Sequence, residues 1–240
     1  MCRWIDTDPI PIQLLALRDE FVSRDYDPPD TWWPDQPTVV GGRDRRAGGS
    51  WCVSDVVSGT TAVVLNRPGR AALSPEAPSR GTLPLLAVAH GPDWARFIEL
   101  GPMAGFNLVL ATPDRLIWWS YDGEQLRAEE LARGTWMFTP TGRLDRPLDP
   151  RLAGGRAHLG ADLAGSTRDA WPEWLAVIDS TPASSEPGAL LVARTVGADR
   201  YETVFGQFIA ARPGLLRVDH LDRPAAGGTW TTRHWPAEGR

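Results

Sequence analysis

The sequence predicts an α+β fold in which antiparallel sheets pack with helical layers. Short, β-rich apolar runs occupy both ends of the chain, beginning at 2–5 and finishing at 229–235. Helical patterns lie between them at 79–100 and again at 169–178. Strands at both ends with helices in between are typical of a layered α+β sandwich.

The first strands are expected at 2–5 and 12–17, joined by a turn at Asp6-Thr7-Asp8-Pro9. The three consecutive charges Arg18-Asp19-Glu20 are expected to end the second strand. Proline lacks a backbone N–H, so the Pro-rich stretch 25–37 is expected to exclude regular sheet. Paired glycines at 41–42 and 48–49 flank a charged tip and favour tight turns with φ > 0.

A second hairpin is predicted at 50–53 and 60–65. Ser79 is placed to cap a helix that starts near Pro84, and Pro92 is placed in the first turn of a second helix. A further helix is predicted at 169–178, followed by a loop at 180–188. The remaining strands are expected at 106–110, 115–121, 126–131, 135–138, 190–196, 202–209, 215–218 and 229–235.

Composition is that of an ordinary globular protein, with 42% hydrophobic and 23% charged residues among 240. No linker or repeat divides the chain, so we expect a single domain over 1–240. The net charge of -5 argues against a nucleic-acid-binding face. All 25 basic residues are arginine, which excludes a P-loop, Schiff-base or general-base lysine.

The two cysteines, Cys2 and Cys52, cannot form a disulfide framework and fit a reducing compartment. The apolar stretch 10–17 is too short for a membrane helix and lacks a signal-peptide cleavage site. We therefore expect a cytoplasmic protein without membrane insertion. Its oligomeric state is not predicted.

Cys2 is the first candidate for chemistry. If Met1 is removed, one residue carries a thiol and a free α-amine, whose ordinary pKa of roughly 7.7–8.0 allows it to act as a base near neutral pH. The thiol is then activated without a histidine, as in N-terminal nucleophiles. The alternative is a buried, inert thiol, since free cysteine is among the most buried residue types.

Six ordered motifs accompany Met1-Cys2. They are Leu15-Ala16-Leu17-Arg18-Asp19-Glu20-Phe21 with Arg24, Gly42-Arg43-Asp44, Gly48-Gly49-Ser50-Trp51, Leu65-Asn66-Arg67, Ser79-Arg80-Gly81 and Gly105-Phe106-Asn107-Leu108. In this order and spacing they give the chain a resemblance to the NRDE family, which includes transport and Golgi organisation protein 2 of animals. The match is clear over about 1–120 and weak beyond, through Arg200 and Thr203.

The resemblance implies a four-layer αββα sandwich like that of the N-terminal-nucleophile hydrolases, with two antiparallel sheets between helical layers. It implies a cysteine amidohydrolase in which Cys2 attacks the carbonyl of a small amide or thioester. Arg18 would lower the thiol pKa, Asp19 or Glu20 would orient the α-ammonium, and Asn66 would donate to the oxyanion. Arg200 would supply a second cation.

Each role has an alternative. Arg18, Asp19 and Glu20 also fit a turn whose charges face solvent or pair with Arg24, and Asn66 also fits a plain turn. Asn107 is expected to satisfy backbone groups. Two departures from the family pattern, and one from the similar cysteine amidases with their mid-chain oxyanion asparagine, argue against efficient amide hydrolysis. They are Leu17 in place of asparagine, Asn66-Arg67-Pro68 in place of Asn-Tyr-Arg, and no asparagine around Phe138-Thr139-Pro140-Thr141-Gly142.

The sequence also gives expectations for the aromatic residues, for metals and for ligands. One of Trp118 and Trp119 should be buried because neighbouring strand residues face opposite sides. The four histidines show no metal-ligand spacing, so no metal site is expected. Hydrolysis requires no cofactor. The resemblance also implies an alternative role as a carrier of haem, with Cys2 as axial ligand, or of an acyl ligand. Either role implies a small-molecule partner.

Overall fold

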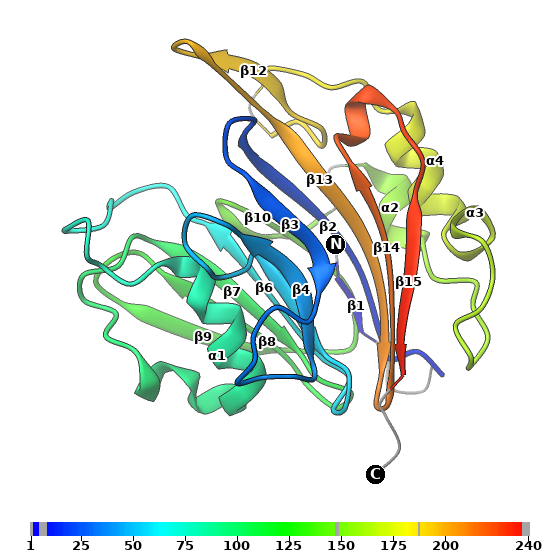
Figure 1. Cartoon of the computed structure of the whole chain (residues 1–240), viewed down its shortest axis with the longest axis horizontal. Helices are drawn as coiled ribbons and strands as arrows, with labels where there is room; N and C mark the ends of the chain where they lie inside the picture. The colour runs from blue at the N-terminus through cyan, green and yellow to red at the C-terminus, as the bar shows by residue number, and fades with distance from the viewer. Residues whose placement is uncertain (1, 5–8, 147–148, 187, 237–240) are drawn as a thin grey trace.

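The computed structural model describes residues 2–4, 9–146, 149–186 and 188–236 and has two antiparallel sheets (Figure 1). The α+β class is therefore confirmed. The strand order of the first sheet is β11-β10-β1-β2-β13-β14-β15, with β12 paired to β13. Its strands are β1 (Cys2–Trp4), β2 (Ile12–Phe21), β10 (Gly134–Thr139), β11 (Gly142–Leu144), β12 (Ala193–Val196), β13 (Asp199–Arg212), β14 (Leu215–Asp222) and β15 (Thr231–Pro236).

The second sheet follows chain order, from β3 to β9. Its strands are β3 (Tyr26–Asp30), β4 (Val39–Asp44), β5 (Cys52–Asp55), β6 (Thr60–Asn66), β7 (Phe106–Ala111), β8 (Leu116–Tyr121) and β9 (Leu126–Leu131). The helical segments are η1 (Arg80–Thr82), α1 (Leu83–His90), η2 (Gly91–Phe97), α2 (Pro150–Gly154), α3 (Thr167–Ala170), α4 (Pro172–Ser180) and η3 (Pro224–Ala226).

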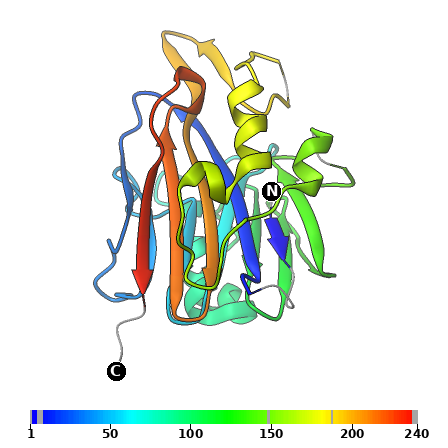
Figure 2. The same cartoon turned by 90° about the vertical axis from the view of Figure 1, so that its right-hand side faces the viewer.

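Three apolar clusters hold these elements together. One lies between the sheets and includes Leu14 and Val109. A second packs the outer face of the first sheet, including Phe208, against α2, α3 and α4 (Figure 2). A third packs the second sheet against α1 and η2 through Leu83 and Trp94. Helices thus cover the outer face of each sheet.

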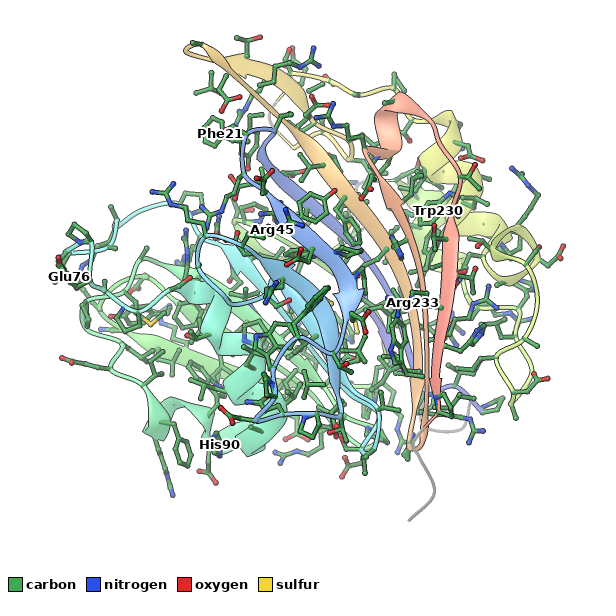
Figure 3. The ribbon with its side chains drawn as sticks, viewed as in Figure 1. Phe21, Arg45, Glu76, His90, Trp230 and Arg233 are labelled. Atoms are coloured by element: carbon green, nitrogen blue, oxygen red, sulfur yellow. The ribbon has the colours of Figure 1, made fainter. Side chains whose placement is uncertain are left out.

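The alternation of side chains along β2 explains its central place. Leu14 and Ala16 belong to the cluster between the sheets, whereas Leu15 belongs to the cluster under the helices. Trp230 stacks on Phe208 on this helical side, with 4.6 Å between ring centroids, and Figure 3 shows it there. Each face of β2 is therefore buried against a different layer.

The first hairpin is confirmed, since β1 pairs antiparallel to β2 with Cys2 opposite Leu14. The turn predicted at Asp6-Thr7-Asp8-Pro9, and Ile5, lie largely outside the described residues. The predicted end of β2 at Leu17 is wrong. The strand continues to Phe21 because β13 pairs with it along this whole stretch, placing Phe205 opposite Arg18.

The exclusion of sheet from 25–37 is also wrong, because β3 contains Pro28 and Pro29. This strand is at the edge of its sheet, and its register shifts between Asp27 and Asp30, where the prolines lie. Edge strands and bulges are the positions where a missing backbone N–H is tolerated.

The glycine pairs at 41–42 and 48–49 have different structural roles. Gly48 has φ 72° and forms the predicted turn. Gly41 and Gly42 instead lie inside β4, and a methyl group on Gly42 would lie 2.3 Å from the Trp51 ring. Close approach of neighbouring groups, and not turn geometry, requires glycine there.

The helix predicted at 169–178 is interrupted. Trp171, with φ -132° and ψ 47°, ends α3, and Pro172 begins α4. Trp171 and Trp174 are both fully buried and stack with 5.5 Å between centroids. The helix predicted to start near Pro84 is confirmed as α1, but Ser79 does not cap it. Ser79 instead caps η1, where its side chain accepts a hydrogen bond from the Gly81 N–H, and α1 follows Thr82 without a side-chain cap.

Candidate functional site

The candidate site lies where β1 begins. Cys2 pairs with Leu14 on β2 and with Trp136 on β10. Beyond this point β2 and β10 both continue, to Phe21 and Thr139, and no described strand lies between them. A cavity of about 300 Å³ lies at this gap. It is lined by both faces of β2 (residues 14–20), by 137–140, by 63–66 and by 79–81, among others.

Cys2 lies at this cavity but is almost fully buried, with 2% of its surface exposed. Burial raises the pKa of its thiol to about 12. A thiol in this state is protonated near neutral pH, and the thiolate is the nucleophilic form. Activation of Cys2 therefore needs a base close to the sulfur.

Arg18 lies on β2 between the sheets and is only 7% exposed. Its guanidinium group stacks over the Trp51 ring, 4.6 Å from the centroid, and lies 5.3 Å from that of Tyr26. Nη2 donates to Asp44 Oδ2 at 3.2 Å and lies 3.7 Å from Glu20 Oε2. Burial lowers the pKa of Arg18, against the charges of Glu20 and Asp44.

Asp44 organises the polar half of the cavity. Its Oδ2 also accepts from Arg24 Nε at 2.7 Å, while its Oδ1 accepts from the N–H groups of Arg46 and Ala47. Burial opposes ionisation, but the bonds from Arg24 and Ala47 and the charge of Arg18 lower the pKa of Asp44 below its usual value. Asp44 is therefore a fixed anion that clamps two arginines.

Arg80 supplies a third guanidinium group to the cavity lining. It begins η1, which packs against the β4–β5 connection because the Ser50 N–H donates to the Gly81 carbonyl at 2.8 Å. Arg80 Nη1 donates to the Gly105 carbonyl at 3.0 Å. Burial and the charge of Arg24 lower the pKa of Arg80, and Glu20 opposes them.

Asp19 and Glu20 lie on opposite faces of β2. Glu20 belongs with Arg18 and Arg24 between the sheets. Asp19 Oδ1 accepts from Thr203 Oγ1 at 2.6 Å, across the β2–β13 pair. Burial raises the pKa of Asp19, against the Thr203 bond and the charge of Arg194. Both carboxyl groups lie in a strand, so the turn of the alternative interpretation is wrong, but its pairing with Arg24 is present, since Arg24 Nε lies 3.6 Å from Glu20 Oε2.

Asn66 ends β6 and lines the cavity, as the oxyanion hypothesis requires. Asn107 does not line it. Its Nδ2 donates to the Pro140 carbonyl at 3.0 Å and its Oδ1 accepts from Trp118 Nε1 at 3.2 Å, so its predicted backbone role is confirmed. Thr139 and Pro140, in the stretch where the sequence lacks an asparagine, also line the cavity.

Arg200 is placed elsewhere. It is absent from the described lining of the cavity, 66% of its side chain is exposed, and Nε pairs with Glu202 at 3.1 Å. The structure thus brings Cys2, Arg18, Asp19, Glu20 and Asn66 to one cavity but leaves Arg200 outside it.

A protein-family model described as Transport and Golgi organisation 2 matches residues 3–150, more than half of the chain. The chain belongs to this family. The matched region contains β2, Asp44, Asn66 and Arg80, whereas Cys2 and Arg200 fall outside it. No curated protein matches the sequence.

Three cavity residues were not assigned a role from the sequence, namely Arg24, Asp44 and Arg80. All three belong to motifs that carry the resemblance to this family. The signal was therefore present, because charged residues inside ordered motifs are candidates for a site. The sequence does not show that the charged residues of different motifs lie together in the fold. Arg18 and Asp44, for example, form a hydrogen bond but are 26 residues apart in the chain.

The described residues contain no group of three or more His, Cys, Asp or Glu side chains placed to hold a metal ion. Among the described residues that line the cavity there is no histidine, and Cys2 is its sole cysteine. No helix in the described part of the chain is long and apolar enough to span a bilayer.

Proposed function

We propose that this chain is an N-terminal-nucleophile cysteine hydrolase that acts on a small amide or thioester. The observation that carries the proposal is the meeting of Cys2, Arg18, Glu20 and Asn66 at one cavity, although they come from three separate strands. A thiol, a cation and an amide donor are the groups that acyl transfer needs.

The proposal includes the fold of that enzyme class, a four-layer αββα sandwich formed by a single domain over 1–240, in the cytoplasm. It is supported by two sheets packed face to face, with helices on the outer face of each. In that class the N-terminal residue lies at the site, which agrees with Cys2 at the cavity.

The reaction begins after Met1 is removed. The Cys2 α-amine takes the thiol proton while the sulfur attacks the carbonyl carbon and the carbonyl π electrons move to oxygen. Asn66 donates its amide N–H to this oxyanion. When the carbonyl re-forms, the bond to the amine or thiol leaving group breaks, and the α-ammonium returns the proton to it. Water then attacks the acyl-enzyme thioester and releases the acid and the free thiol.

The need for the α-amine follows from the state of the thiol. Burial raises the Cys2 pKa to about 12, and Arg18 bonds to Asp44. An effect of Arg18 on the thiolate stays a prediction. An amine on the same residue removes the proton as the C–S bond forms, so no stable buried thiolate is needed.

Intact mass spectrometry of the purified protein tests the first step, and we expect a chain that lacks Met1. A β-lactone probe should then add one acyl group to the wild type and none to Cys2→Ala. Cys52→Ala is the matched control, because Cys52 is equally buried at 1% exposure and burial also raises its pKa. Retention of Met1, or labelling of Cys2→Ala, would contradict the proposal.

A non-catalytic carrier of an acyl or haem ligand is the second candidate. It is favoured by the protonated state of the Cys2 thiol and by Leu17, an apolar cavity residue where the family has asparagine. The lining fits an acyl ligand better than haem, because the described lining residues contain no histidine and the thiol is held protonated. A haem titration of wild type and Cys2→Ala separates a haem carrier from an acyl carrier. Ligation of haem by the Cys2 thiolate predicts an absorbance change in the wild type that Cys2→Ala loses.

A further inference from the structure

The charged half of the cavity has an uncompensated positive charge. Three arginines, Arg18, Arg24 and Arg80, line it between the sheets, together with the carboxylates of Glu20 and Asp44. Asp19 also lines the cavity but bonds to Thr203, with Arg194 nearby, on the other face of β2. One guanidinium charge between the sheets therefore has no counter-ion among the described residues.

Two arginines of the cavity lining, Arg18 and Arg80, are incompletely bonded. Arg18 Nη1 is buried and has no hydrogen-bond partner among the described residues, although the rest of the side chain is tightly held. A buried donor without a partner is unfavourable until an acceptor occupies the site. Arg80 belongs to no ion pair in the described part of the chain and bonds to a backbone carbonyl through Nη1. Arg80 and Arg18 thus leave donors for one further acceptor group.

The opposite half of the cavity is apolar. Where β2 and β10 separate, its walls are side chains on the helical side of the sheet. They are Leu15, Leu17, Met137, Leu152 and Leu190. The cavity therefore has a cationic end between the sheets and an apolar end that passes through the gap in the first sheet.

We propose that the ligand of this cavity is a monocarboxylate with an apolar body, and that Arg80, with Arg18, recognises its carboxylate. One unpaired positive charge matches a single negative charge, and guanidinium groups suit the planar carboxylate. A volume of about 300 Å³ limits the apolar body to a short or medium chain. The inference rests on the proposed function and deepens it by naming the substrate class, an amide or thioester that also carries one free carboxylate apart from the bond that is cleaved.

The test compares octanoate with uncharged octanamide by isothermal titration calorimetry on the full chain. We expect the wild type to bind octanoate at least about tenfold more tightly than octanamide, as expected for a charge-assisted hydrogen bond. Arg80→Gln should weaken octanoate binding by about tenfold and leave octanamide binding unchanged. Arg80→Lys should lie between, because it keeps the charge without the planar donors.

Arg96→Gln is the matched control, since Arg96 is 79% exposed and does not line the cavity. It should bind both probes as the wild type does. Equal wild-type affinity for the two probes, an equal loss of both in Arg80→Gln, or binding of neither probe would overturn the inference.

Cys2→Ala separates this inference from the hydrolase proposal. It should still prefer octanoate, because the carboxylate site does not include the thiol. If the β-lactone probe fails to acylate the wild type although the wild type prefers octanoate, the hydrolase proposal alone fails. If the probe acylates the wild type but the wild type does not prefer octanoate, the carboxylate site alone fails.

Discussion

Two buried arginine–aspartate pairs lie on opposite faces of the first sheet and differ in how completely they are bonded. Arg217 and Asp219 on β14 are both 0% exposed. Arg217 donates to both carboxylate oxygens and to the carbonyls of Leu163 and Gly165. Asp219 accepts further bonds from Thr167, Trp171 and Thr232. Every group in this network has a partner.

The Arg18–Asp44 pair is bonded incompletely. Arg18 Nη1 has no hydrogen-bond partner in the described part of the chain, and Arg18 lines the cavity and shares Asp44 with Arg24. The two pairs therefore differ in bonding although both are buried. A closed network fixes α3 onto the sheet, whereas an open one leaves donors for a ligand.

Asp219→Ala is expected to have the largest effect, and it tests whether the Arg217–Asp219 network stabilises the fold. It leaves the Arg217 guanidinium fully buried without a counter-charge, so we expect the free energy of unfolding to fall by about 3–5 kcal/mol. Urea denaturation measures the change. Glu130→Ala is the control, since that carboxylate is 53% exposed in a surface pair with Arg115, and the free energy of unfolding should change far less than in Asp219→Ala. Equal losses would contradict a structural role for the closed network.

Gly42→Ala tests whether the Trp51 ring positions Arg18 in the Arg18–Asp44 pair. The new methyl group would overlap the Trp51 ring on which Arg18 stacks. We expect a loss of about 1–3 kcal/mol from overpacking, together with weaker octanoate binding because Arg18 is displaced. Gly154→Ala, where a methyl meets nothing within 4 Å, should change neither quantity. Unchanged octanoate affinity in Gly42→Ala would show that Trp51 does not position Arg18.

The sequence predicted most strands because their apolar runs and turn residues are local signals. The boundaries it missed depend on distant partners. Arg18-Asp19-Glu20 were expected to end β2, yet Asp44 and Thr203 provide the partners that keep these charges in the strand. The interruption at Trp171 had a local signal, because Pro172 is suited to a first helical turn.

Only the site residues that lie in recognisable sequence motifs could be predicted. Cys2 was a candidate from its position, and the resemblance added Arg18, Asp19 or Glu20, and Asn66, all of which line the cavity. Arg200 came from the same resemblance and is absent from the described lining. The charge balance of the cavity did not follow, because it requires knowing that Asp19 points away from Glu20 and that η1 brings Arg80 beside Arg24. These are facts of tertiary packing that spacing along one chain does not contain.

Arg18→Met sharpens the comparison between the pairs. Asp44 keeps Arg24 and two backbone N–H groups, so no buried charge is stranded. The variant loses the stacking on Trp51, and we expect a loss of about 0.5–2 kcal/mol, smaller than for Asp219→Ala. Octanoate binding should weaken, while octanamide binding should not. A stability loss as large as that of Asp219→Ala would place Arg18 in a structural network.

The smallest expected effect concerns pH and His220, which follows Asp219 on β14 and stacks on Phe205 between the sheets. Burial lowers its pKa below the usual 6.5, together with the charge of Arg233 and against Asp222 and Asp219. The unfolded chain therefore binds a proton more readily, so stability falls as pH drops below about 6.5. His220→Gln should flatten the dependence of unfolding free energy on pH between about 7 and 5. The aspartates of both pairs stay ionised in this range because their pKa values are lowered. An unaltered slope in His220→Gln would mean that other groups cause the acid sensitivity of the inter-sheet region.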